Sequence, residues 1–259
     1  MTALSCLGLS SAKAGEEVSK LLSSYSCIER VAAKVRTTSS SEGGQVASLA
    51  RVHFEQGGLL HVQNVVPLKR RIISDGVSLH YKTDEEPQGY RKTIEELDPS
   101  WLGQLRNVPG SPMEYLFPLE TLDEDKLLPS DGAASAIGCS LGNTYVVLSF
   151  DDLGRLVRIT YFESANLTGK KMEHRFSNFD EPCPGAWLAR THETVKESKG
   201  QHILSTTEFS NMAVNQPVHD VLFKPAHFFP DVAFVDRLID TQVDSDPDPD
   251  TPPDLPRIP

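Results

Sequence analysis

The chain has 259 residues, of which 39% are hydrophobic, and 36 acidic against 25 basic residues give it a formal net charge of -11. An acidic surface repels nucleic acid and anionic membranes, so we expect neither as a standing partner. No apolar run reaches the roughly 18 to 20 residues that a membrane-spanning helix needs, which excludes a chain that crosses the bilayer as a helix.

Residues 1–14 have features of a truncated secretory signal. A short apolar stretch at residues 3–9 precedes Ala12-Lys13-Ala14, which has the A-x-A form of a signal-peptidase site. No basic residue precedes the stretch, and we interpret this as an n-region lost to a wrongly chosen start codon. A frayed terminus is the alternative.

The four cysteines, Cys6, Cys27, Cys139 and Cys183, contain no C-x-x-C pair. Removal of the predicted signal, which contains Cys6, would leave three cysteines, an odd number. Cys139 and Cys183 both lie in segments with strand patterns, and an oxidising periplasm would allow them to pair. Free, buried cysteines fit the spacing equally well.

Apolar residues at steps of three and four predict a long helix over residues 16–36. Leu21, Leu22, Tyr25 and Val35 fall on its apolar face. A Ser- and Gly-rich run, residues 37–44, is expected to end it.

From residue 50 the apolar period changes to two, which predicts strands around 50–55, 60–62 and 70–74. Asp75-Gly76 is a strong two-residue hairpin signal, because both turn positions favour positive φ. Alternation over residues 77–82 then predicts the partner strand.

Two short helices are expected in the middle of the chain. The first covers residues 98–107, where Asp98 can cap the helix and Pro99 suits its first position. The second covers residues 113–117.

The second half of the chain repeats the strand pattern at residues 144–150, 155–162, 171–179, 187–194 and 201–209. No helix of crossover length separates these strands, which argues against parallel βαβ units. The sequence therefore predicts one long helix followed by a meander of about nine or ten antiparallel strands.

Residues 241–259 contain six prolines and five aspartates. Such a composition cannot form a core, so we predict a disordered tail. Residues 15–240 are then predicted to be a single domain.

A search for catalytic patterns finds no nucleophile elbow, no phosphate-binding loop and no H-E-x-x-H. His192-Glu193 begins like a zinc-binding helix, but Lys196 stands where the second ligand is needed. We therefore expect no catalytic residues, no metal and no cofactor, and an enzyme is the least favoured function class.

The strands can either form two sheets that pack as a sandwich or one strongly curved sheet that wraps around the helix. In the second case the sheet can enclose an apolar cavity, and in a secreted protein without catalytic residues such a cavity would accept lipid. The alternative is that the same side chains fill a core. The predicted cavity-lining residues are Leu21, Leu22, Tyr25, Val52, Phe54, Leu60, Val62, Leu79, Tyr81, Val157, Ile159 and Tyr161.

Two segments resemble the LolA family of periplasmic lipoprotein carriers. Val66-Pro67, Ile72-Ile73-Ser74-Asp75-Gly76 and Leu79-His80-Tyr81 are similar to the family's "P…ivsDG..lw.Y" hairpin. Residues 209–217, followed by 220–223, are similar to its "y.nv.vN..l.d.lF" ending. With the N-terminal helix, these features occur in the family's order over residues 16–235.

The resemblance implies a mainly β fold with some α: an unclosed antiparallel barrel, or half-barrel, around an N-terminal helix and short covering helices. It also implies a cavity for the acyl chains of lipoproteins. The family commonly has a basic residue and a proline on the strand before a turn, where this chain reads Phe54-Glu55-Gln56-Gly57-Gly58.

The resulting hypothesis is a soluble, monomeric periplasmic chaperone that carries lipoproteins toward the outer membrane. The partners it implies are lipoprotein acyl chains or another lipid, an inner-membrane release complex and an outer-membrane acceptor, with no nucleic acid. The alternative is an envelope sensor or assembly component that uses a related half-barrel to bind partner proteins without transferring cargo.

Overall fold

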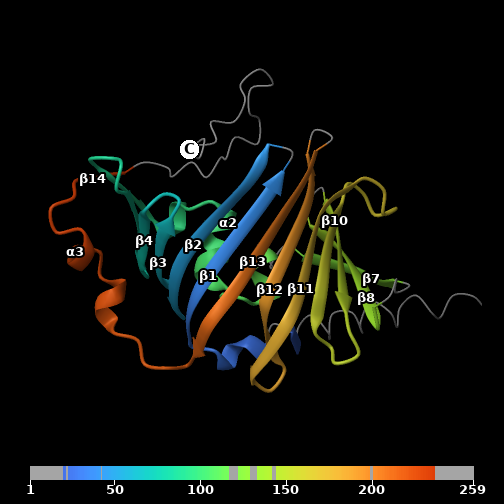
Figure 1. Ribbon diagram of the computed structural model, residues 1–259. Coiled ribbons are helices and arrows are strands. Elements are labelled where there is room, and N and C mark those ends of the chain that lie inside the picture. The colour runs from blue at the N-terminus through green and yellow to red at the C-terminus, as the bar shows by residue number, and fades with distance from the viewer. Residues whose placement is uncertain are drawn as a thin grey trace, which may run out of the picture.

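The computed structural model describes residues 20–21, 23–41, 43–116, 122–128, 133–141, 144–198 and 201–236. Within them, fourteen strands form one strongly curved sheet (Figure 1). The first six are β1 (Arg30–Ser41), β2 (Gly44–Glu55), β3 (Leu59–Val66), β4 (Arg70–Asp75), β5 (Ser78–Thr83) and β6 (Gly89–Thr93). The others are β7 (Leu122–Leu128), β8 (Ser135–Leu141), β9 (Thr144–Phe150), β10 (Leu156–Phe162), β11 (Lys170–Cys183), β12 (Ala186–Ser198), β13 (Gln201–Val214) and β14 (Phe234–Asp236).

The sheet consists of two antiparallel meanders that meet where β1 pairs with β13. Its order is β14-β6-β5-β4-β3-β2-β1-β13-β12-β11-β10-β9-β8-β7. The edge strands β14 and β7 do not pair with each other, so the sheet is not closed. The predicted unclosed antiparallel half-barrel is confirmed, with more strands than the nine or ten expected.

The prediction of a helix over residues 16–36 is wrong in its second half. Helical structure ends with a 3-10 turn, η1 (Tyr25–Cys27), and β1 begins at Arg30. Val31, Ala33 and Val35 also fit a period of two, and Val31 and Ala33 are buried. Because β1 pairs along its length with both β2 and β13, hydrogen bonds on both of its edges favour the strand over a local helix.

Asn215 fixes the point where β1 begins. Its Oδ1 accepts hydrogen bonds from the backbone N–H groups of Glu29 (2.8 Å) and Arg30 (3.2 Å), and its Nδ2 donates to the carbonyl of Cys27 (2.8 Å). A left-handed backbone (φ 54°), which asparagine tolerates, aims the side chain. The asparagine of the C-terminal motif thus holds the N-terminal segment in place through these three hydrogen bonds.

The expected hairpin at Asp75-Gly76 forms, although its turn geometry differs from the prediction. Only Gly76 has a positive φ, of 86°. Asp75 stays in β4, and its Oδ1 accepts hydrogen bonds from the N–H groups of Val77 (2.9 Å) and Ser78 (2.8 Å).

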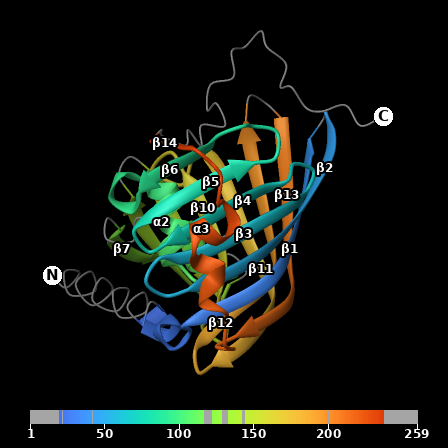
Figure 2. The same cartoon turned by 90° about the vertical axis from the view of Figure 1, so that its left-hand side faces the viewer.

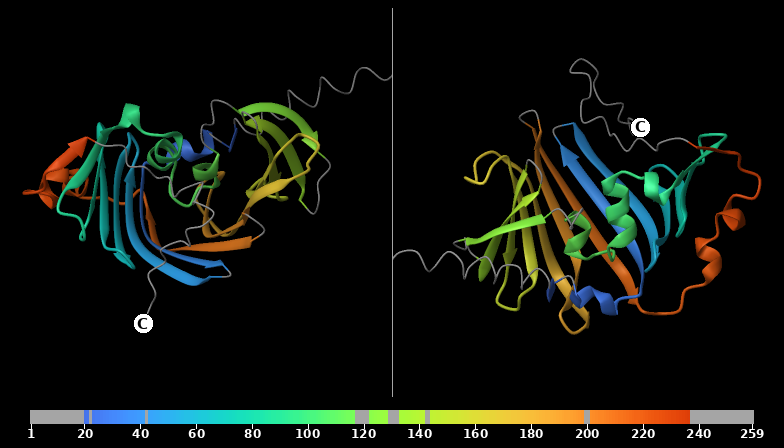
Figure 3. Two further views of the ribbon diagram at one scale, coloured as in Figure 1. Left: turned by 90° about the horizontal axis from the view of Figure 1, so that it is seen from above. Right: turned by 180° about the vertical axis from the view of Figure 1, so that it is seen from behind.

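Both expected short helices are present, as α2 (Pro99–Arg106) and the 3-10 helix η3 (Pro112–Tyr115). Asp98 caps α2 as predicted, because its Oδ1 accepts from the N–H of Trp101 (3.2 Å). Both helices lie inside the curve of the sheet (Figure 3). Between them, Gly110 (φ 81°) accepts a hydrogen bond from the N–H of Ala189 on β12 (2.8 Å), which holds this segment against the sheet.

The C-terminal segment crosses the convex face of the sheet (Figure 2). It comprises η5 (Asp220–Phe223), α3 (Pro225–Phe228) and β14, which pairs in parallel with β6. The remaining short element, η2 (Ile94–Glu96), follows β6.

Cys27 and Cys183 form a disulfide. The pairing of Cys139 with Cys183 is therefore wrong, and Cys139 is buried on β8 instead. The predicted signal at 1–14 and the predicted tail at 241–259 lie outside the described residues.

Candidate functional site

A cavity of about 640 Å³ lies between the concave face of the sheet and the segment that contains α2 and η3. We call it the concave cavity. The sheet contributes Val35, Thr37, Ser48, Ala50, Val52, Leu60, Val62, Asn64, Arg70, Ile72, Thr207 and Phe209, and the helical segment contributes Trp101, Gln104, Pro109, Glu114 and Tyr115.

The side chains of the sheet wall change from apolar to polar along the strands. Ala50, Val52 and Val62 present methyl groups, whereas Thr37 and Thr207 lie farther along their strands and share a hydrogen bond of 3.1 Å. Toward the same end of the neighbouring strands β3 and β4, Arg70 Nε donates to Asn64 Oδ1 (3.0 Å). The arrangement can hold an apolar chain with a polar group at its end.

Glu114 is the one carboxyl group among the lining residues. Its Oε2 accepts a hydrogen bond from the backbone N–H of Gly110 (2.9 Å). Desolvation by burial raises the pKa of Glu114 to about 8. The hydrogen bond from Gly110 lowers this pKa, but by less than burial raises it. At neutral pH this side chain is therefore mostly protonated, and the cavity wall carries little negative charge there.

The structure separates the twelve predicted lining residues into groups. Val52, Leu60 and Val62 line the concave cavity. Leu21, Phe54, Leu79 and Ile159 are buried in the packed core, and Tyr81 and Tyr161 pack against it. Val157 is half-buried on β10, and Leu22 lies outside the described residues.

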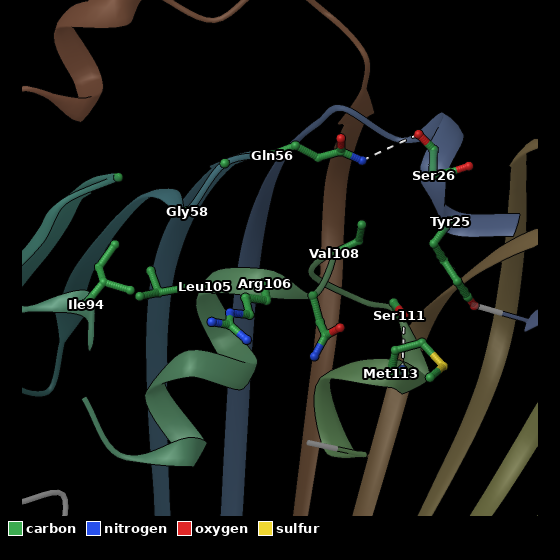
Figure 4. A pocket seen from close by; sticks show the side chains of 13 residues that line it. Tyr25, Ser26, Gln56, Gly58, Ile94, Leu105, Arg106, Val108, Ser111 and Met113 are labelled. Carbon is green, nitrogen blue, oxygen red and sulfur yellow. Dashed lines mark hydrogen bonds between the residues drawn. The ribbon is translucent and has the colours of Figure 1, made fainter. Parts of the chain in front are cut away.

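Tyr25 lines a second cavity, of about 490 Å³, beside the turns that join β2 to β3 and β4 to β5 (Figure 4). Its hydroxyl donates to the carbonyl of Trp187 (2.7 Å). Gln56, within the Phe54–Gly58 stretch that departs from the family pattern, donates to the carbonyl of Ile28 (2.8 Å). This stretch therefore supports the N-terminal segment in the structure.

On the part of the concave face formed by β10 to β12, aromatic and histidine side chains pack together. The Tyr115 ring lies tilted against the rings of His192 and His174, with centroids 4.1 and 4.7 Å apart, and His174 Nδ1 lies 3.0 Å from His192 Nε2. Tyr161 donates a hydrogen bond to the carbonyl of Tyr115. Burial lowers the pKa of His174 to about 4 and that of His192 to about 3, so both rings are neutral at pH 7.

Several cavity residues were not identified from the sequence. The periodicity around Val35 predicts a helix. Trp101 and Glu114 belong to α2 and η3, and no local sequence pattern predicts that these segments pack over the sheet. Ala50, Ile72 and Phe209 could have been found, because each lies on the apolar face of a correctly predicted strand.

Within the described residues, no group of three or more His, Cys, Asp or Glu side chains could hold a metal ion. No helix in this part of the chain is both long and apolar enough to cross a bilayer.

No protein-family model and no curated protein matches the sequence. Solved structures do match. A LolA superfamily protein from Nitrosomonas europaea aligns with a TM-score of 0.54 at 12% identity, over 82% of this chain and 97% of that protein. A protein domain assigned to outer membrane lipoprotein sorting, from Vibrio parahaemolyticus, aligns with a TM-score of 0.56 at 12% identity, over 83% and 100%.

The chain has the LolA-like fold. A DUF1329 family protein from Desulfovibrio piger shares the architecture, with a TM-score of 0.59 at 10% identity over 83% of this chain and 98% of that protein. In this LolA-like fold the concave cavity lies inside the half-barrel, under α2 and η3.

Proposed function

We propose that the protein is a periplasmic carrier that binds the acyl chains of lipoproteins in the concave cavity and acts without catalysis. The observation that carries the proposal is the cavity itself. Its volume of about 640 Å³ lies within the range of roughly 300 to 1,000 Å³ typical of small-molecule sites. Methyl-bearing side chains from β1 to β4 form much of its wall.

The energetics of such a site favour long chains. Each methylene that leaves water contributes about 0.8 kcal/mol, so the cavity gains affinity with chain length until it is full. The raised pKa of Glu114 supports the proposal, because a protonated carboxyl group is compatible with an adjacent hydrocarbon chain.

The disulfide and the relatives support the proposed location. Disulfides persist in oxidising compartments such as the periplasm. One of the solved relatives is assigned to outer membrane lipoprotein sorting. Transfer of cargo from an inner-membrane release complex to an outer-membrane acceptor is part of the proposal.

Native mass spectrometry of the protein purified from its own envelope tests the function. The proposal predicts an added mass that matches a lipid or lipopeptide and disappears after denaturation. A folded protein that consistently carries no such mass and takes up no acyl probe would exclude the carrier function. A half-barrel that binds partner proteins would then be the better hypothesis.

A further inference from the structure

A third cavity, of about 390 Å³, lies on the convex side of the half-barrel, where β3 turns into β4. We call it the basic cavity. Lys69, Arg70, Arg71 and Lys82 contribute to its sheet wall, and Phe228 and Phe229 form part of the opposite wall. Figure 2 shows α3 lying across this part of the sheet.

The charge of the basic cavity is opposite to that of the whole chain. Four cationic side chains line it against one carboxylate, Asp84, although the formal net charge of the chain is -11. Among the described residues none of the four cations forms an ion pair. The Lys82 ammonium instead donates to the backbone carbonyls of Thr83 and Glu86. An anion at this position would meet an excess of positive charge, with four cations against the carboxylate of Asp84.

Arg71 is the most constrained of the four. Its guanidinium lies 4.5 Å from the centre of the Phe228 ring, and its Nε is buried without a hydrogen-bond partner. Desolvation by burial lowers the pKa of Arg71, while the charge of Asp84 acts in the opposite direction. A buried N–H of a cation without an acceptor is costly, and an anionic oxygen would satisfy it.

The basic cavity and the concave cavity share two lining residues near the turn between β3 and β4, Asn64 and Arg70. Alternation along β4 directs Ile72 toward the concave cavity and Arg71 toward the basic one. A molecule with an apolar chain in the first cavity could therefore place its polar end in the second.

We propose that the basic cavity binds the phosphate-type anionic headgroup of a lipid whose acyl chain occupies the concave cavity. The inference rests on the proposed function and specifies the cargo as an anionic amphiphile. It locates headgroup recognition on Lys69 and Arg71, where sequence reasoning found no site.

Two titrations test the proposal on the full chain. In the first, short-chain phosphatidylglycerol and diacylglycerol of the same chain length, which lacks the phosphate, compete against a neutral naphthylamine probe bound in the concave cavity. In the second, calorimetry measures glycerol phosphate, the headgroup without chains, and inorganic phosphate. Lys69→Gln and Arg71→Gln remove cations from the cavity. Arg91→Gln is the matched control, because Arg91 lies on the same face but pairs with Asp236 at 3.0 Å.

We expect phosphatidylglycerol to displace the probe at about ten-fold lower concentration than diacylglycerol, as one charge-assisted contact would produce. Lys69→Gln or Arg71→Gln should reduce this preference while leaving diacylglycerol unaffected, and Arg91→Gln should retain it. Equal displacement by both lipids in the wild type, or a preference that survives both substitutions, overturns the inference. If inorganic phosphate binds but the two lipids displace the probe equally, the basic cavity is a site for free anions, and the inference is again overturned.

The failure of the proposed function gives a different pattern. If the neutral probe does not bind the folded wild type, the carrier proposal fails, and the glycerol phosphate titration still decides the basic cavity. If glycerol phosphate then binds and Lys69→Gln weakens this binding, the basic cavity is a headgroup site without an acyl-chain site. If glycerol phosphate does not bind either, both the headgroup site and the acyl-chain site are excluded.

Discussion

Cys27 and Cys183, separated by 156 residues, are joined by a disulfide that ties the segment before β1 to the end of β11. A cross-link over so long a loop restricts the unfolded chain strongly, and its contribution to stability is about 2 to 5 kcal/mol. We therefore expect the double variant Cys27→Ser with Cys183→Ser to fold with a melting temperature lowered by several degrees.

Reduction of the wild type with dithiothreitol should produce the same fall in melting temperature, measured by circular dichroism. The double variant serves as the control, since the reductant should not change its melting temperature further. If both Cys27 and Cys183 of the wild type react with a thiol reagent before reduction, this disulfide does not form.

His61 should make the protein sensitive to acid. Its side chain is 4% exposed, and burial lowers its pKa to about 4, with smaller contributions from Arg71 and His53. Below pH 6.5 the unfolded chain binds a proton that the folded chain excludes, so stability falls as the pH decreases toward 4. This lowering of the pKa from 6.5 to about 4 corresponds to about 3 kcal/mol.

Denaturant unfolding at pH 7 and pH 4 measures this effect. The variant His61→Gln should lose less stability over that interval than the wild type. His202→Gln, at an exposed position on β13, should match the wild type. Equal losses in all three proteins would contradict the assignment of His61 as a buried neutral ring.

Glu114 should make the protein sensitive to base. Its folded-state pKa of about 8 exceeds the ordinary value of 4.5, so the unfolded chain releases its proton first as the pH rises. Stability should therefore fall between about pH 4.5 and pH 8, and Glu114→Gln should reduce that fall. Affinity for an acyl probe should also decrease above pH 8 in the wild type and stay constant in the variant.

The predicted signal at residues 1–14 has a direct test. Protein recovered from its host envelope should begin at Gly15, which N-terminal sequencing would detect. A mature chain that begins at Met1 would contradict the proposed periplasmic location.

Local signals identified the parts of the fold that local chemistry determines. Asp98 before Pro99 marked the start of α2, and Asp75-Gly76 marked a hairpin, because capping and turn formation involve neighbouring residues. The segment at Val31–Val35 satisfies both helical and strand periods, and its pairing with β13 comes from far along the chain. The same limit applied to Cys27, whose partner is defined by tertiary structure alone.

The candidate site shows a similar division. Alternation placed Val62 and Ile159 correctly on inward faces, but it could not distinguish a cavity from a packed core. That difference depends on α2 and η3. Tyr115 fills the space beside His192, while the segment around Trp101 leaves room beside Ala50.

Titration of an acyl probe against two tryptophan variants tests the central claim most directly. Ala50 faces the concave cavity, and its neighbour Leu49 is 40% exposed on the opposite face of β2. Ala50→Trp should fill the cavity and reduce probe affinity at least ten-fold, whereas Leu49→Trp should bind like the wild type. Melting curves on the same samples confirm folding. If folded Ala50→Trp binds the probe as tightly as the wild type, the concave cavity is not the acyl-chain site.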